Sequence, residues 1–374
     1  MEDFLSLIQA CLCKSADIIG KYQLQLYWRN GVRSLTVKKN ILSRSQTRQI
    51  QTYFAPYFKV DYSTHAYLYE KTGRFAVNYI PYYIHYTIID PYFNDWKWAA
   101  QNANKCFQRK LFGLEKHEMP QTIAYRCNDI WYDSDDNIIG KEYAIKLISE
   151  GNDVFVKPAS GSCGGKGIMR LTPIAVSNCS TECIDNKSIV NIIKDYTNDI
   201  IVQKTLTQSP TLSQINSSSI NTVRCMSLLM KTGEVKIVSC ILRVGAKGSV
   251  VDNLHSGGFC IGIDESGKLM SLGYTIEGKT ATHHPDSGVE FQGIQIPSFS
   301  EMKKLVSKAH RHVPKCRLVS WDIAFDENEN PILVEGNLSS GGIGVHQLSK
   351  GPIFGDDTIA ILNEVYGKGQ FHNK

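Results

Sequence analysis

The stretch "SWDIAFDENENPILVEGN", near the C-terminal end of the chain, constrains the fold more than any other segment. Its centre, "DENENP", is rich in turn-forming residues, and apolar and polar residues alternate on both sides. The stretch therefore predicts a β-hairpin. If Asp326 pairs with Pro331, then Asp322 lies directly opposite Glu335, and Asn337 lies two residues further along the same face.

The other face of this predicted hairpin is apolar. In the same register it collects Trp321, Ile323, Phe325, Ile332 and Val334. A slip by one residue would put Trp321 and Ile323 beside the carboxylates, which the hydrophobic pattern disfavours.

Two ionised carboxylates on facing strands repel each other unless a cation compensates them. Carboxylate and amide oxygens form an oxygen-rich set that suits Mg²⁺ shared with nucleotide phosphates. The pattern favours a metal site at Asp322, Glu335 and Asn337. The alternative is a solvated polar face on a surface hairpin.

A second informative stretch is the glycine-rich loop in "DVFVKPASGSCGGKGIMRL". Only Ser162, Cys163 and Gly164 separate Gly161 from Gly165-Lys166, so the spacing of a Walker A loop is absent, and the Rossmann G-x-G-x-x-G pattern also fails. Apolar runs on both sides predict that the loop joins two strands. Glycine-freed backbone amides can bind an anion there, and a plain hairpin loop is the equally weighted alternative.

The rest of the chain reads as mixed helix and strand. Residues 1–50 and a segment beginning at residue 99 have helical periodicity. Residues 53–98 are crowded with aromatic residues, which favour a core or a surface between domains; a sugar-stacking surface is the alternative. The polar run "TQSPTLSQINSSSIN" predicts a connector or hinge. Two hairpins, around "KTGE" and "ESG", and a helix over "SEMKKLVSKAHRHV" follow it.

Composition narrows the functional class. The formal net charge of +5 is too mild to indicate nucleic acid, but it suits a polyanionic ligand such as a nucleotide. The eleven cysteines form no disulfide framework, which favours a reduced, cytoplasmic protein. The acidic start "MEDFLSLIQACLCK" does not read as a signal peptide, and no apolar run is long enough to predict a membrane span.

Five stretches, taken in order, resemble the ATP-grasp superfamily, and in particular its sugar-transfer-associated branch, linked to capsule and surface-polysaccharide synthesis. They are "FVKPASGSCGGKGI", "QSPTLSQINSSSINTVR", "DNLHSGGFCIGID", "HHPDSGVEFQGIQIP" and "WDIAFDENENPILVEGN". The resemblance implies an α+β ATP-grasp fold that holds a nucleotide between two subdomains. It suggests an N-terminal helical and aromatic-rich region over residues 1–98, a small lid subdomain with the glycine loop over 99–206, and a large subdomain with the metal-binding hairpin over 207–374.

The resemblance also implies roles for individual residues. Those expected to bind the nucleotide are Lys105, Lys157, Ser160, Gly161, Gly164, Gly165, Lys166, Gln203, Lys204 and Leu206. Those expected to act at the transferring phosphoryl group, or to position it, are Arg224, Arg243 and Asn221. The sequence departs from the family at position 203, where Gln stands in place of the acid of many relatives, so the residue that contacts the ribose stays unassigned.

The activity implied by the resemblance is an ADP-forming carboxylate–amine ligase that works through an acyl phosphate. Its cofactors would be ATP and one or two Mg²⁺, with Mn²⁺ as an alternative. Its substrates would be small molecules or glycan-linked. The enzyme would join an amino acid to a sugar acid or amino sugar. Two other hypotheses remain: a kinase with Asp252 or His283 as base, and a non-catalytic nucleotide-binding protein.

Overall fold

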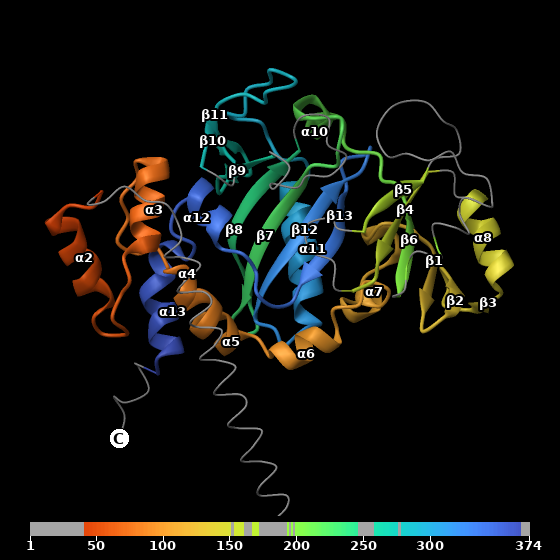
Figure 1. The fold of residues 1–374 in the computed structure, drawn as a ribbon, viewed down its shortest axis with the longest axis horizontal. Coiled ribbons are helices and arrows are strands. Elements are labelled where there is room, and N and C mark those ends of the chain that lie inside the picture. The colour runs from red at the N-terminus through yellow and green to blue at the C-terminus, as the bar shows by residue number, and fades with distance from the viewer. Residues whose placement is uncertain are drawn as a thin grey trace, which may run out of the picture. The chain divides into compact units, whose positions relative to one another are not determined.

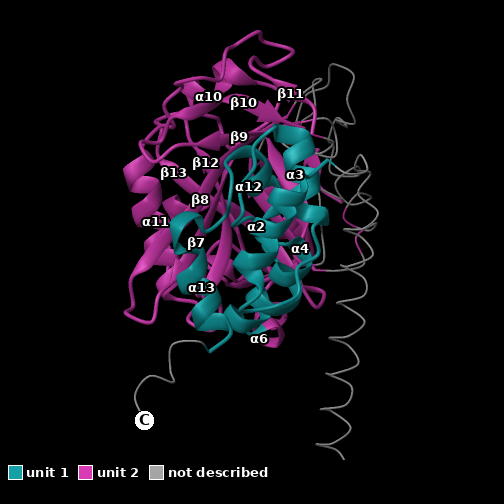
Figure 2. Ribbon diagram, turned by 90° about the vertical axis from the view of Figure 1, so that its left-hand side faces the viewer, with its two compact units in different colours: residues 1–95, 340–374 teal, residues 96–339 magenta. Residues whose placement is uncertain are grey.

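The computed structural model of the chain describes residues 41–150, 153–160, 167–171, 193, 196, 199–245, 258–275 and 278–367. Internal contacts divide the chain into two compact units, which Figure 2 colours separately. Unit 1 comprises residues 1–95 and 340–374, and unit 2 comprises residues 96–339.

Unit 2 contains a six-stranded antiparallel sheet in the order β3-β2-β1-β6-β4-β5 (Figure 1). Its strands are β1 (Thr122–Cys127), β2 (Ile130–Asp133), β3 (Ile138–Ile139), β4 (Val154–Pro158), β5 (Met169–Leu171) and β6 (Ile200–Lys204). Helix α8 (Lys141–Glu150) contacts β1 and β2, and its apolar side buries Ala144, Ile145 and Ile148 in a core with Val156 and Val202. The strand–loop–strand arrangement predicted around the glycine loop is confirmed by the pairing of β4 with β5.

A seven-stranded antiparallel sheet forms the larger part of unit 2, in the order β11-β10-β9-β8-β7-β12-β13. Its strands are β7 (Thr222–Leu229), β8 (Val235–Val244), β9 (Phe259–Ile263), β10 (Leu269–Tyr274), β11 (Thr280–Ala281), β12 (Leu318–Phe325) and β13 (Pro331–Asn337). Helix α11 (Phe299–Arg311) lies against β7, β8, β12 and β13, and its apolar stripe buries Met302, Val306 and Ala309. The two hairpins and the helix predicted for this region are confirmed.

One of the two predictions for the connecting segments of unit 2 is wrong. The helix predicted from residue 99 is divided into α6 (Trp96–Gln101) and α7 (Gln108–Leu111), because the Asn104 side chain accepts a hydrogen bond from the Cys106 backbone and holds a turn between them. The polar run predicted as a connector does link β6 of one sheet to β7 of the other, and it contains α10 (Pro210–Ile215), which begins where the Ser209 hydroxyl caps Leu212 N at 3.2 Å. Among the described residues of unit 2, a further short helix is η2 (Lys116–Glu118).

Unit 1 is helical. Its helices are α2 (Arg44–Phe54), α3 (Ser63–Thr72), α4 (Tyr82–Ile84), η1 (His85–Ile89), α5 (Asp90–Phe93), α12 (Gly344–Ser349), η4 (Gly355–Asp357) and α13 (Thr358–Val365). Phe54, Tyr79 and Phe93 are buried, so aromatic residues of this region form a core as predicted. Most of the helical segment predicted over residues 1–50 lies outside the described residues.

The C-terminal residues group with the N-terminal ones, whereas the sequence-based division placed them in the large subdomain. Gln347 provides one reason: its side-chain amide accepts from Ile80 N at 2.8 Å and donates to Ile80 O at 3.0 Å. This pair satisfies the backbone of Ile80 as a strand partner would. In the part of the chain that is described, no helix has the length and apolar character needed to cross a membrane.

Candidate functional site

The β12–β13 hairpin brings the two predicted carboxylates together. Asp322 faces Glu335, and Ser320 faces Asn337, so Glu335 and Asn337 share one face of the strand. The predicted opposition of Asp322 and Glu335 is therefore confirmed.

A β-bulge between Asp322 and Ile323 changes the register nearer the turn. There Phe325, and not Asp326, faces Pro331, so that part of the predicted register is wrong. The bulge puts the fully buried Leu333 into the core with Trp321, Ile323 and Phe325. The prediction that Ile332 and Val334 complete that apolar face is wrong for the same reason.

Asp322 is a buried carboxylate held by two arginines of neighbouring strands. Arg224, on β7, donates from Nε and Nη2 to the two carboxylate oxygens, each at 2.9 Å. Arg243, on β8, reaches Asp322 Oδ2 at 3.4 Å and also donates to the Thr222 hydroxyl at 2.7 Å. Burial alone would raise the pKa of Asp322, but the two guanidiniums lower it to about 2. The carboxylate is therefore ionised at neutral pH.

Glu335 is held by Lys105, whose Nζ lies 3.0 Å from Glu335 Oε1. Lys105 belongs to the turn between α6 and α7, and its backbone N–H donates to Ala159 O at 2.7 Å, next to the end of β4. The turn that sequence periodicity missed thus fixes the predicted upstream lysine between the two sheets of unit 2.

Lys157, on β4, has a neutral partner. Its Nζ donates to Gln203 Oε1 at 3.0 Å, and Gln203 is itself 6% exposed on β6. Burial is the main cause that lowers the pKa of Lys157 to about 8; Glu335 works in the opposite direction and Lys105 in the same one. Both predicted lysines therefore lie within electrostatic reach of Glu335.

Gly336 separates the two predicted metal ligands of β13 for a packing reason. A Cβ at this position would lie 2.6 Å from the Phe112 ring and 2.9 Å from the Trp321 ring. The Gln108 side chain pairs with the Gly336 backbone through two hydrogen bonds of 3.3 Å. Close packing of α7 against β13 thus places Lys105 beside Glu335, and the sequence offered no periodic signal for it.

The other predicted site residues are less closely tied to this cluster. Asn221 is fully buried and donates from Nδ2 to Leu212 O and Asn216 O, both at 2.9 Å, so it braces the end of α10. Lys204 and Ser160 are exposed and Leu206 is half-buried. The predicted residues Gly161, Gly164, Gly165 and Lys166 lie outside the described residues.

The donor set of the hairpin fits a hard cation. Asp322 and Glu335 face each other, and an amide oxygen of Asn337 is available, since its Nδ2 donates to Ser320 O at 3.3 Å. Ammonium and guanidinium groups already compensate both carboxylates, so a bound cation would share these carboxylates with Lys105 and Arg224. Within the described ranges, no group of three or more His, Cys, Asp or Glu side chains has the arrangement of a metal site. The candidate ligands at the hairpin are thus only two carboxylates, of Asp322 and Glu335, together with the amide of Asn337.

Solved structures that resemble the chain share little sequence with it. They include the biotin carboxylase domain of the 2-oxoglutarate carboxylase of Hydrogenobacter thermophilus, at 14% identity over 74% of this chain and 48% of that one, with a TM-score of 0.42. The D-Ala:D-Ser ligase VanG of Enterococcus faecalis has 14% identity over 71% of this chain and 61% of that one, with a TM-score of 0.41. The chain thus spans about half to three-fifths of the length of these two proteins.

No curated protein matches the sequence. A family model does: the one described as sugar-transfer associated ATP-grasp matches residues 90–357, which is most of the chain and includes every predicted site residue. The resemblance predicted from the sequence motifs is confirmed, and the chain belongs to the sugar-transfer associated ATP-grasp family.

Proposed function

We propose that the protein is an ATP- and Mg²⁺-dependent ligase that joins a carboxylate to an amine through an acyl phosphate. The observation that carries the proposal is the convergence of Lys105 and Lys157, 52 positions apart in the sequence (157 minus 105), on Glu335 of the carboxylate hairpin. Two cations beside a pair of carboxylates match what a nucleotide triphosphate and its metal ion need.

In this proposal each group of residues has a separate task. Lys105 and Lys157 bind phosphate oxygens, and Gln203, Lys204 and Leu206 line the base. Asp322, Glu335 and Asn337 hold one or two Mg²⁺, with Mn²⁺ as a substitute, and the bound ion neutralises charge on the phosphates. The glycine loop with Ser160, Gly161, Gly164, Gly165 and Lys166 covers the β- and γ-phosphates.

Arg224 and Arg243 are assigned to the transferring phosphoryl group. Both guanidiniums lie at Asp322 and are only partly exposed, at 22% and 14% of their side chains. Their planar forks suit the oxygens of a phosphoryl group, and water exclusion strengthens the interaction. Asn221 keeps its predicted role only as a positioning residue, through the segment that leads into β7.

The reaction proceeds in two displacements. A substrate carboxylate oxygen attacks the γ-phosphorus of ATP, and the bond to the ADP oxygen breaks. The amine nitrogen of the second substrate then attacks the acyl carbon, loses a proton, and inorganic phosphate leaves. Little covalent chemistry is required of the protein, because positioning and charge supply most of the rate enhancement.

The family description, sugar-transfer associated, supports a substrate related to sugars. We assign an amino acid as one substrate and a sugar acid or amino sugar, free or glycan-linked, as the other, for use in surface-polysaccharide synthesis. We place the reaction in the cytoplasm, where cysteines stay reduced. The domain division proposed with it is a lid over residues 99–206 and a large subdomain from residue 207.

The test is the mass of the product. The protein is incubated with Mg·ATP and pools of amino acids, sugar acids and amino sugars, and released phosphate and new masses are measured. A ligase gives a product equal to the sum of two substrates less one water, whereas a kinase adds one phosphoryl group to one substrate. Glu335→Gln removes the product, and Glu327→Gln, an exposed acid at the tip of the same hairpin, does not. Phosphoryl addition, or turnover that survives Glu335→Gln, would contradict the proposal.

A further inference from the structure

A pocket of about 100 Å³ lies in unit 2 between the six-stranded sheet and the segment of α7 and η2. One buried water needs roughly 10–15 Å³, so the pocket has room for a group of several heavy atoms. Its polar lining includes Lys105, Arg109, Lys116, Thr122, Tyr125 and Gln203. It shares Lys105 and Gln203 with the proposed nucleotide site and extends from them along β1 to the β2–β3 turn.

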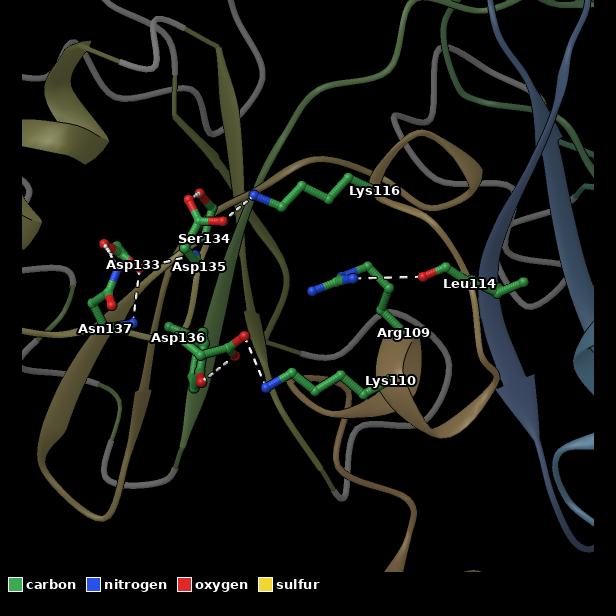
Figure 3. Close-up of polar contacts among 10 residues, drawn as sticks. Arg109, Lys110, Leu114, Lys116, Asp133, Ser134, Asp135, Asp136 and Asn137 are labelled. Atoms are coloured by element: carbon green, nitrogen blue, oxygen red, sulfur yellow. Dashed lines mark hydrogen bonds and ion pairs between the residues drawn. The ribbon is translucent and has the colours of Figure 1, made fainter.

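Arg109 forms no ion pair with the described residues, although the Asp136 carboxylate, which also lines the pocket, interacts with it electrostatically. The two neighbouring lysines each have an acidic partner. Lys110 Nζ lies 2.8 Å from Asp136 Oδ2, and the Lys116 ammonium is paired with Asp135. The Arg109 guanidinium, by contrast, donates only a long hydrogen bond of 3.5 Å from Nη1 to Leu114 O (Figure 3). Among the described residues, no carboxylate lies within ion-pair distance of it.

The walls of the pocket are fixed before any ligand arrives. Asp133 accepts hydrogen bonds from the backbone N–H groups of Asp135, at 2.8 Å, and Asn137, at 3.0 Å, and so holds the β2–β3 turn. The Tyr125 hydroxyl donates to Asp136 Oδ1 at 2.7 Å, and its ring stacks on Tyr132 with centroids 4.8 Å apart. A rigid frame lowers the entropy cost of binding.

We propose that this pocket binds a small oxyanion, namely a phosphate or carboxylate group of a small molecule, with Arg109 as its main contact. A guanidinium presents a planar fork that matches the oxygens of either group, and charge-assisted hydrogen bonds are the strong ones. Lys116 and the Thr122 hydroxyl, which also line the pocket, add a second charge and a donor. The inference does not depend on the proposed ligase activity.

Isothermal titration of the nucleotide-free protein tests this site, with inorganic phosphate in one arm and glucuronate, a carboxylate without phosphate, in the other. Arg109→Gln is expected to weaken binding about tenfold to a hundredfold, the effect of removing charge-assisted hydrogen bonds. Lys116→Gln is expected to act in the same direction by a few-fold, since Lys116 keeps Asp135 as a partner. Lys146→Gln, an exposed lysine of α8, is the matched control and should leave the affinity unchanged.

The Lys157→Ala variant separates this pocket from the nucleotide site. Anion binding that survives Lys157→Ala and is lost in Arg109→Gln supports the pocket. Loss in Lys157→Ala with no effect of Arg109→Gln means that the anion occupies the proposed phosphate site, which overturns this inference and leaves the proposed function standing. Absence of binding to the unaltered protein in both arms also overturns it. If Arg109→Gln fails to fold, by far-ultraviolet circular dichroism, Arg109→Lys and Lys116→Gln decide the same question.

Discussion

Asp322 and Lys157 are both charged groups withdrawn from water in unit 2, but the protein compensates them differently. Asp322, in the seven-stranded sheet, has two arginines, and its pKa falls to about 2, so it stays charged. Lys157, in the six-stranded sheet, has the neutral Gln203 as its hydrogen-bond partner, and burial lowers its pKa to about 8. Among the described residues, no carboxylate forms an ion pair with it. The fold therefore already supplies the charges that compensate Asp322, whereas the buried charge of Lys157 would be stabilised most by an added anion.

The largest expected effect comes from removing Asp322, the charged group that the fold compensates with two arginines. Asp322→Ala leaves Arg224 and Arg243 close together without their shared carboxylate, and loss of one partner of a buried ion pair costs about 3–5 kcal/mol. We expect urea denaturation to show a fall of that size in the free energy of unfolding. Glu327→Ala, at the exposed tip of the same hairpin, should change it by less than about 0.5 kcal/mol. Equal effects would mean that the two arginines do not depend on Asp322.

The second prediction concerns Lys157, the charged group whose hydrogen-bond partner is neutral. Lys157→Met keeps the length of the side chain and removes a charge that burial makes unfavourable, so we expect the free energy of unfolding at neutral pH to rise and not to fall. The stabilisation by saturating Mg·ATP, about 2.7 kcal/mol at a hundredfold excess over the dissociation constant, should disappear. Thermal unfolding with and without Mg·ATP measures both. Lys146→Met is the control, and a nucleotide response that persists in Lys157→Met would contradict the role of Lys157.

The sequence predicted the surroundings of Asp322 better than those of Lys157. Alternating apolar residues predicted that Asp322 faces Glu335, because side chains on paired strands share a face through purely local rules. The bulge beside Ile323 could not be predicted, since it depends on how Leu333 packs in the core. The motif around Lys157 was visible in the sequence, but its neutral partner Gln203 required knowledge of which strands are neighbours.

The same limit explains the residues that sequence analysis missed. Gln108 and Arg109 belong to the run "FQRKLFG", which reads as an ordinary helix with polar and charged residues on its surface. Only the turn at Asn104 and the close packing of Phe112 on Gly336 place that helix against β13. Tertiary packing, and not any residue type, gives Gln108 and Arg109 their positions.

The third prediction uses pH to separate the two groups. The pKa of Asp322 is lower in the folded than in the unfolded protein, so its contribution of about 2 kcal/mol is present above pH 3.8 and is lost as the pH falls toward 2. The pKa of Lys157 is also lower when folded, so its charge destabilises the protein below pH 8, and stability recovers as the pH rises from 8 toward 10.5. Unfolding curves of the unaltered protein and of Lys157→Met, compared across pH, test this. Only the alkaline rise should vanish in Lys157→Met.

The smallest expected effect distinguishes the two arginines at Asp322. Arg224 makes two hydrogen bonds of 2.9 Å to the carboxylate, whereas Arg243 approaches it at 3.4 Å and is held mainly by the Thr222 hydroxyl. Because charge-assisted bidentate bonds are stronger than a single long contact, Arg243→Gln should lower the free energy of unfolding by about 1 kcal/mol, and Arg224→Gln by about 2 kcal/mol. Urea denaturation of both variants measures the difference. A larger loss for Arg243→Gln would mean that Thr222, and not Asp322, determines the stability of this arginine pair, and Asp322 would then be freer to bind a cation than its pKa of about 2 suggests.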